Sequence, residues 1–122
     1  MIVVPDKYVD TPDYTRVYKR LLEAAREGEV VFYLDVAKIM GIAMTAADLK
    51  REVAHMLAEI SQSEHYQGRP MLSAIVMSSK NAPVAGFFEL AHHFGKLKMR
   101  TPEAEMRFWE EEKAAVYERW GK

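Results

Sequence analysis

The feature that most constrains this chain is the order of structural signals between residues 28 and 88. Apolar periodicity and turn residues divide this stretch into short elements. In chain order they are a short strand at 29–32, a short helix at 33–40, a turn on Gly41, a long helix at 46–66, a strand at 71–78, a Pro/Gly loop and a second extended segment starting at Gly86. The run at 71–78 is apolar on both faces, which is typical of a strand that is covered on both sides.

Strand, helix, helix, strand, loop and strand is the order of a winged helix-turn-helix. The sequence therefore predicts an α+β, winged-helix-like fold in which helices pack on a small antiparallel sheet, with an extra helix at the C-terminus. A chain of 122 residues is long enough for one hydrophobic core and too short for two. We expect a single domain over residues 1–122, with its core at 12–95 and the C-terminal helix at 102–120.

Composition narrows the functional class. Apolar residues make up 49% of the chain and charged residues 29%, which is ordinary for a globular protein. The longest apolar runs are far below the roughly 18 residues that a membrane span needs, and no apolar leader follows Met1. The chain has no cysteine, which excludes disulfides, thiolate metal sites and cysteine nucleophiles. These observations predict a cytoplasmic protein that does not enter a membrane.

Helix boundaries and the core follow from local signals. Thr11 and Pro12 predict a helix start, as do Thr101 and Pro102, and Gly28 predicts a stop. Thr45 with Asp48 resembles a capping box, which places the start of the long helix at Ala46. The predicted core consists of the residues on the apolar stripes: Val17, Leu21, Leu22, Val36, Ile39, Leu49, Val53, Met56, Leu57, Ile60, Leu72, Ile75, Val76, Phe87, Leu90, Trp109 and Val116.

Positive charge is concentrated in one segment. The chain has a formal net charge of -1, but residues 69–100 carry five basic side chains and one acidic side chain. If the helix at 46–66 is a recognition helix, Lys50, Arg51 and His55 are its reachable donors to base edges. The other cations would then contact phosphates: Arg69, Lys80, Lys96 and Lys98. A solvated surface without a nucleic-acid partner is the alternative interpretation of the same charges.

The C-terminal helix carries an aromatic stripe that includes Trp109, Tyr117 and Trp120. Such a stripe is typical of core packing, but aromatic residues are also enriched at protein interfaces. A second hypothesis is therefore a winged-helix-like protein-interaction module that uses this helix as its contact. Homodimerisation is compatible with the same pattern.

One segment resembles a known family. Phe32-Tyr33-Leu34-Asp35-Val36-Ala37, followed by Gly41-Ile42, is similar to the Thr-Tyr-x-x-Leu-Ala…Leu-Gly segment in the winged-helix DNA-binding domain of alkyltransferase and alkyltransferase-like proteins. Phe32 stands where that family has Thr. The resemblance covers about a third of the chain and implies a DNA-binding scaffold, and the absence of cysteine excludes alkyl transfer. The segments at 68–74 and 86–91 also resemble small bacterial proteins of unassigned function.

Candidate enzyme sites are weak. Glu52 with His55, and Glu89 with His92, share the Glu-x-x-His spacing that builds di-metal sites in helical bundles. The apolar stripe of the long helix points Glu52 and His55 away from a bundle interior. We therefore expect no metal, no cofactor and no catalytic site. Nucleic-acid binding is the first hypothesis and protein interaction the alternative.

Overall fold

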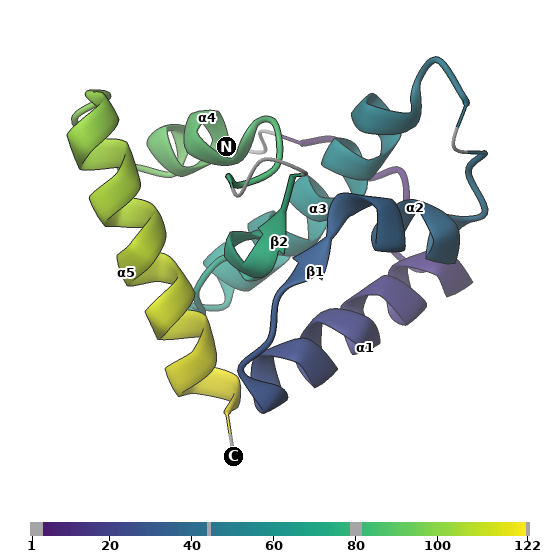
Figure 1. Ribbon diagram of the computed structural model, residues 1–122, viewed down its shortest axis with the longest axis horizontal. Helices are drawn as coiled ribbons and strands as arrows, with labels where there is room; N and C mark the ends of the chain where they lie inside the picture. The colour runs from purple at the N-terminus through teal and green to yellow at the C-terminus, as the bar shows by residue number, and fades with distance from the viewer. Residues whose placement is uncertain (1–3, 44, 79–81, 122) are drawn as a thin grey trace.

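The computed structural model describes residues 4–43, 45–78 and 82–121 (Figure 1). Helices dominate this part of the chain, and the two strands are very short. In chain order the elements are α1 (Pro12–Glu27), β1 (Val31–Phe32), α2 (Tyr33–Met40), α3 (Leu49–Tyr66), the 3₁₀ turn η1 (Leu72–Ile75), β2 (Val76–Met77), α4 (Phe87–His93) and α5 (Pro102–Trp120).

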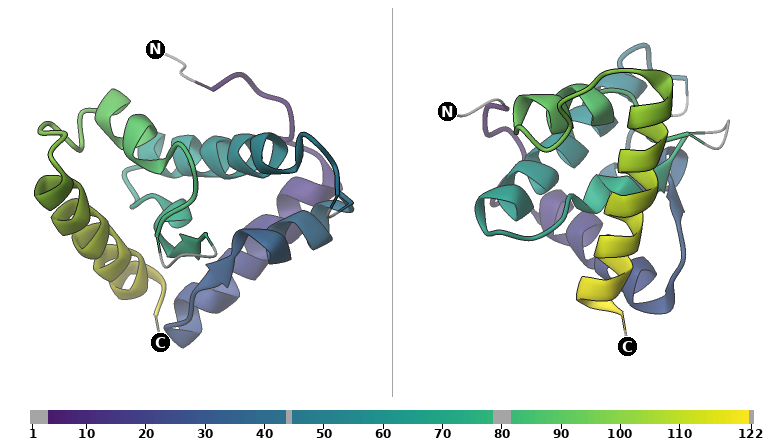
Figure 2. Two further views of the ribbon diagram at one scale, coloured as in Figure 1. Left: turned by 45° about the horizontal axis from the view of Figure 1, so that its top comes forward. Right: turned by 90° about the vertical axis from the view of Figure 1, so that its left-hand side faces the viewer.

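The strands and η1 lie in the middle of the molecule, and the helices surround them (Figures 1 and 2). α3 and α5 both pack against η1, while α1 packs against α2, α3 and α5. The C-terminal helix closes one side of this arrangement, and its Trp109 and Val116 are buried. α5 is therefore a wall of the core and not an appendage to it.

The sheet differs from the predicted one. β1 and β2 run parallel, with Val31 beside Val76 and Phe32 beside Met77. The predicted α+β, winged-helix-like fold with helices on a small antiparallel sheet is therefore wrong. The chain is mostly helical, and its sheet is a two-residue parallel pair that cannot form a winged-helix platform.

The predicted strand at 71–78 is mostly not a strand, because side chains of α3 and α5 form hydrogen bonds with its buried backbone groups. Buried N–H and C=O groups need partners, and a sheet ladder is only one way to supply them. Here side chains from α3 and α5 supply them: the Met71 N–H donates to Glu112 at 2.8 Å, the Ser73 N–H donates to the Ser61 hydroxyl at 3.1 Å, and the Ala74 C=O accepts the Trp109 indole N–H at 2.9 Å. The run is buried as predicted, but without neighbouring strands on both sides.

The predicted wing is also replaced. Gly86 has a φ of 87°, a left-handed conformation that glycine adopts cheaply, and α4 begins directly after it where an extended segment was expected. The chain does reverse before this point, because the Ser78 N–H donates to the Ala82 C=O at 2.8 Å. Residues 79–81, which include Lys80, lie outside the described part of the chain.

The cap predictions are confirmed at two helices. The Thr11 hydroxyl accepts the Tyr14 N–H at 3.2 Å, and the Thr101 hydroxyl accepts the Ala104 N–H at 3.2 Å. α3 begins at Leu49 and not at Ala46, and its N-cap residue, Asp48, forms no side-chain cap. The predicted start of α3 was three residues too early.

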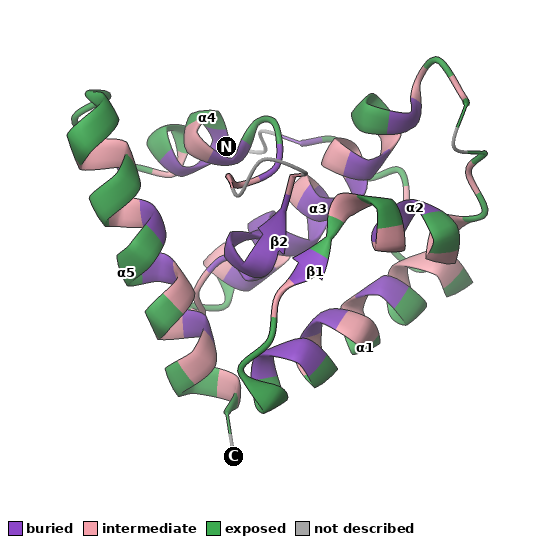
Figure 3. Ribbon diagram, viewed as in Figure 1, coloured by how far each residue is buried: buried purple, intermediate pink, exposed green. Residues whose placement is uncertain are grey.

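The predicted core is confirmed in large part. Every predicted core residue is buried except Leu22 and Ile39, which are half-buried and pack against the same cluster (Figure 3). Within the described residues, no helix combines the length and the apolar character that crossing a bilayer requires.

Candidate functional site

A segment at the N-terminus covers one face of α3. Residues 4–9, which we call the strap, run across α3 before a turn leads into α1 (Figure 2). The α3 side chains that hold the strap are Glu52, His55, Glu59 and Gln62. Their spacings of three and four residues place them on one helix face. We call these four side chains the polar ridge of α3.

Most of the contacts of the polar ridge are to the backbone of the strap. The Gln62 side-chain amide pairs with both backbone groups of Val4, accepting its N–H at 3.1 Å and donating to its C=O at 2.9 Å. The buried Glu59 carboxylate accepts the N–H groups of Tyr8 and Val9 at 2.9 and 3.0 Å. Hydrogen bonds to a charged acceptor are stronger than neutral ones, so this carboxylate is the main anchor of the strap.

His55 and Glu52 complete the attachment. His55 Nε2 lies 3.0 Å from the Pro5 carbonyl oxygen and 3.0 Å from Glu59. Because a carbonyl oxygen can only accept, Nε2 is the ring nitrogen that donates in the bond to Pro5. Glu52 accepts hydrogen bonds from Lys7, at 2.6 Å, and from the Tyr8 hydroxyl. The Lys7 hydrogen bond, together with that of Tyr8, lowers the pKa of Glu52. Burial, with the neighbouring Glu52, raises the pKa of Tyr8.

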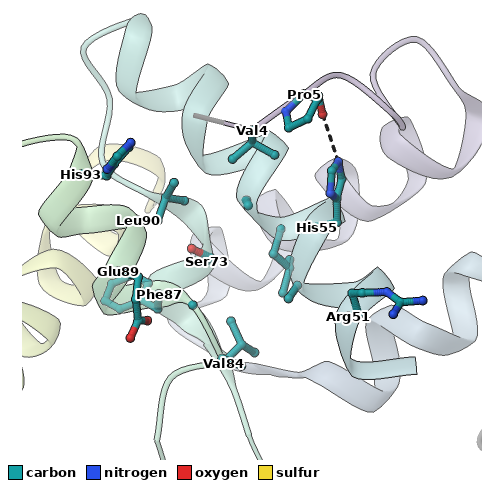
Figure 4. A pocket seen from close by; sticks show the side chains of 15 residues that line it. Val4, Pro5, Arg51, His55, Ser73, Val84, Phe87, Glu89, Leu90 and His93 are labelled. Carbon is teal, nitrogen blue, oxygen red and sulfur yellow. Dashed lines mark hydrogen bonds between the residues drawn. The ribbon is translucent and has the colours of Figure 1, made fainter. Parts of the chain in front are cut away.

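Beside the strap, an apolar groove separates α3 from α4. It has a volume of about 420 Å³. Its lining is Val4, Pro5, Arg51, Ala54, His55, Leu57, Ala58, Ser73, Val84, Ala85, Gly86, Phe87, Glu89, Leu90 and His93. Figure 4 shows Leu90, Val84 and Phe87 on the α4 side, with Val4 and Pro5 of the strap on top. The volume falls within the range of about 300–1,000 Å³ of known ligand pockets.

The groove continues towards α2. A second hollow of about 120 Å³ is lined by Tyr33, Lys50, Val53, Ala54, Ser78, Val84 and Ala85. It shares Ala54, Val84 and Ala85 with the first hollow, so the two hollows adjoin, and we call them together the α3–α4 groove. Its charged and titratable side chains are Tyr33, Lys50, Arg51, His55, Glu89 and His93.

A third hollow lies on the other side of the strap. It has a volume of about 300 Å³ and is lined by Asp6, Val9, Tyr14, Glu59, Gln62, Ser63, Tyr66 and Gln67. Because Val4 and Pro5 border the groove while Asp6 and Val9 border this hollow, the strap forms a wall between the two.

Among the predicted nucleic-acid contacts that the structure describes, several are already engaged within the molecule. Lys50 and Arg51 lie together at the start of α3, but His55 lies under the strap. Arg69 makes a two-point contact with the buried Glu64 at 3.1 and 2.6 Å, and Lys96 pairs with Glu112. Lys98 is exposed, on the segment that follows α4.

The predicted aromatic contacts of α5 mostly face inwards. Trp109 is 2% exposed and donates to the Ala74 carbonyl. The Tyr117 hydroxyl donates to the Glu29 carbonyl at 2.8 Å, which ties α5 to the segment before β1. Trp120 is half-buried, and the guanidinium groups of Arg69 and Arg119 lie 5.6 and 5.4 Å from its ring centroid. These residues fasten α5 to the rest of the molecule.

The two Glu-x-x-His pairs are engaged separately. Glu52 and His55 hold the strap, whereas the exposed Glu89 pairs with Arg100 at 3.3 Å and His92 Nδ1 lies 2.8 Å from the Leu97 carbonyl. Among the described residues, no group of three or more His, Asp or Glu side chains is placed to hold a metal ion.

Sequence reasoning missed Glu59 and Gln62 as functional residues. Both look like surface positions beside the apolar stripe of α3, yet Glu59 is 4% and Gln62 6% exposed. The available signal was the spacing 52, 55, 59 and 62, which places four polar groups in a row along one face of a helix.

Comparison of this chain with family models, with curated proteins and with solved structures gives no match.

Proposed function

We propose that this chain is a protein-interaction module that binds an amphipathic helix of a partner in the α3–α4 groove. The observation that carries this proposal is an open, largely apolar depression that runs along α3 and is walled by α4 and the loop before it. Apolar grooves of this kind bind helices through side chains at i, i+3, i+4 and i+7 of the partner.

The dimensions of the groove suit a short helical contact. Its α3 lining runs from Lys50 to Ala58, which at 1.5 Å per residue spans about 12 Å, or about two turns of a partner helix. The lining includes the small residues Ala54 and Ala58 of α3, and Ala85 and Gly86 of the loop before α4. Small side chains in the lining let a partner approach closely.

Charge at the groove favours an acidic partner. Lys50 and Arg51 border the groove at the start of α3, and Lys50 pairs with no acidic side chain among the described residues. Arg51 is 77% exposed, with its carboxylate neighbours Asp48 and Glu52 at 3.7 and 3.9 Å. A partner helix with an apolar stripe and glutamate or aspartate flanks would therefore gain favourable electrostatics.

The pairing of the other cations supports this proposal over nucleic-acid binding. A protein gains affinity for DNA by neutralising phosphates and releasing their counterions. Arg69 and Lys96 already neutralise Glu64 and Glu112, so a phosphate would have to compete with a buried carboxylate at each.

The test uses two designed peptides with the same leucine stripe, one with glutamate flanks and one with lysine flanks. Each is titrated into isotopically labelled protein, and the amide shifts are followed. We expect the glutamate peptide to bind with a Kd of about 10–100 μM, typical of a small interface, and to shift α3 and α4 signals. The lysine peptide should bind more weakly.

Matched variants make the test specific. Ala54→Phe fills the groove where its two hollows meet and should abolish binding, whereas Ala114→Phe at an exposed site of α5 should not. Arg51→Glu should weaken binding of the glutamate peptide, whereas the control Arg107→Glu, at an exposed site of α5, should leave binding unchanged. Equal binding of both peptides by the Ala54→Phe variant and the native protein would show that the groove is not the contact.

A further inference from the structure

The strap lies on a surface that binds backbone. Gln62 pairs with both the N–H and the C=O of Val4, and Glu59 accepts two consecutive N–H groups. These contacts are made to groups that every residue except proline presents in full. The polar ridge therefore holds a bent stretch of backbone largely without regard to its side chains.

The strap is also poorly enclosed. The groove of about 420 Å³ lies along one side of it and the hollow of about 300 Å³ along the other. Pro5, Asp6, Lys7 and Val9 are exposed, and only Val4 is buried. A segment with so little buried apolar surface detaches at low free-energy cost compared with core elements.

Detachment of the strap would change the surface in two ways. The wall between the groove and the third hollow would disappear, which leaves one furrow across α3. The Glu59 carboxylate would lose its two strap N–H groups and the Gln62 amide its contacts to Val4, and the buried carboxylate would need new donors because buried polar groups are costly when unpaired.

We propose that the polar ridge is a binding site for the backbone of a short, bent peptide segment, that the strap occupies this site in cis, and that a segment of a partner takes its place. The strap itself shows what fits: an irregular segment with a small β-branched side chain at the position of Val4 and a bend that turns two consecutive N–H groups towards Glu59. This inference does not depend on helix binding in the α3–α4 groove, because three of the four ridge side chains, Glu52, Glu59 and Gln62, do not line the groove.

The first experiment measures release of the strap in the full chain. Tyr8→Ala removes the hydroxyl that donates to Glu52 and the ring that packs edge-on against His55, 6.0 Å between centroids, while the polar ridge stays intact. Trypsin cleaves after Lys7 only when the strap is free to enter the protease. We expect cleavage at Lys7 to accelerate by about tenfold, which corresponds to about 1.4 kcal/mol of lost attachment. An unchanged cleavage rate would overturn the proposal, because the strap would then be a fixed part of the fold.

The second experiment tests occupancy in trans. The probe is a blocked synthetic peptide with the sequence of residues 4–9, titrated into labelled protein up to low millimolar concentration. The strap in cis acts at an effective concentration in the millimolar range, so the native protein should bind little of the probe. The Tyr8→Ala variant should bind it and shift the Gln62 side-chain amide signal.

The controls use the same residue type, once on α3 and once at its C-cap. Tyr8→Ala with Gln62→Ala should lose the probe, whereas Tyr8→Ala with Gln67→Ala should keep it, because Gln67 borders the third hollow but its side chain donates to Ser63, and none of its hydrogen bonds among the described residues goes to the strap. Rapid cleavage at Lys7 without probe binding, or probe binding that survives Gln62→Ala, would refute the polar ridge as a peptide site.

Discussion

Replacement of Glu112 is the sharpest test of how α5 is held. Its carboxylate is 7% exposed and accepts hydrogen bonds from the Met71 N–H and from Lys96. Glu112→Ala leaves the buried Met71 N–H without a partner, which costs about 1–3 kcal/mol. It also removes the charge-assisted bond to Lys96, but that side chain is 23% exposed, so water recovers part of the loss. We expect a total loss of about 2–4 kcal/mol in the free energy of unfolding.

Glu112→Gln separates the two contributions. The amide oxygen can still accept the Met71 N–H, so only the charge is lost, and we expect a loss of about 1–2 kcal/mol. Urea unfolding followed by fluorescence of Trp109 and Trp120 measures each variant against Glu111→Ala, an exposed neighbour on the same helix. The reasoning fails if Glu112→Ala and Glu111→Ala differ by less than about 0.5 kcal/mol, since a surface substitution has effects of that size.

Three further predictions follow from the core, the tyrosines and the cations. Ile60→Ala should cost about 2–5 kcal/mol in urea unfolding because Ile60 is fully buried on α3; a loss below about 1 kcal/mol would contradict its placement. Above pH about 10, the free energy of unfolding should fall as pH rises, because burial raises the pKa of four tyrosines and the folded chain keeps protons that the unfolded chain releases. These tyrosines are Tyr8, Tyr14, Tyr18 and Tyr117. Urea midpoints that stay constant between pH about 9 and about 11 would argue against this. The hypothesis of duplex DNA binding is tested by fluorescence anisotropy at several salt concentrations, and we expect no binding at tens of micromolar protein. A slope of about -3 or steeper in log K against log salt would establish at least three phosphate contacts and displace the groove proposal.

Much of the helical framework was predictable because its signals are local. Thr11 and Thr101 cap the helices that they were expected to cap, and the apolar stripe of α3 is buried. The run at 71–78 was misassigned because periodicity reports only that both faces are buried. Whether a buried backbone is satisfied by strands or by side chains depends on residues such as Glu112, which lies 41 positions away from Met71.

The candidate site was harder to predict for the same reason. Gln62 and Val4 are 58 residues apart, and nothing near Gln62 in the sequence indicates a backbone partner. A polar residue beside an apolar stripe is usually solvated, and the sequence offers no means to distinguish that case from a buried contact. The ion pairs of Arg69 and Lys96 were not predicted for a related reason: charge was counted along the chain, whereas pairing depends on which carboxylates the fold brings near.

The dependence of Glu59 on the strap limits what can replace the strap. Glu59 is 4% exposed, and its carboxylate is stable only while hydrogen bonds compensate for its lost hydration; here two strap N–H groups provide them, with His55 Nε2 3.0 Å away. An apolar ligand in that position would leave the charge unpaired, at a cost of several kcal/mol. After detachment, water or the backbone of another peptide can donate hydrogen bonds to Glu59, but an apolar side chain cannot. The polar ridge therefore selects for a peptide backbone, while the apolar groove beside it selects for side chains, and the two surfaces of α3 differ in what they can bind.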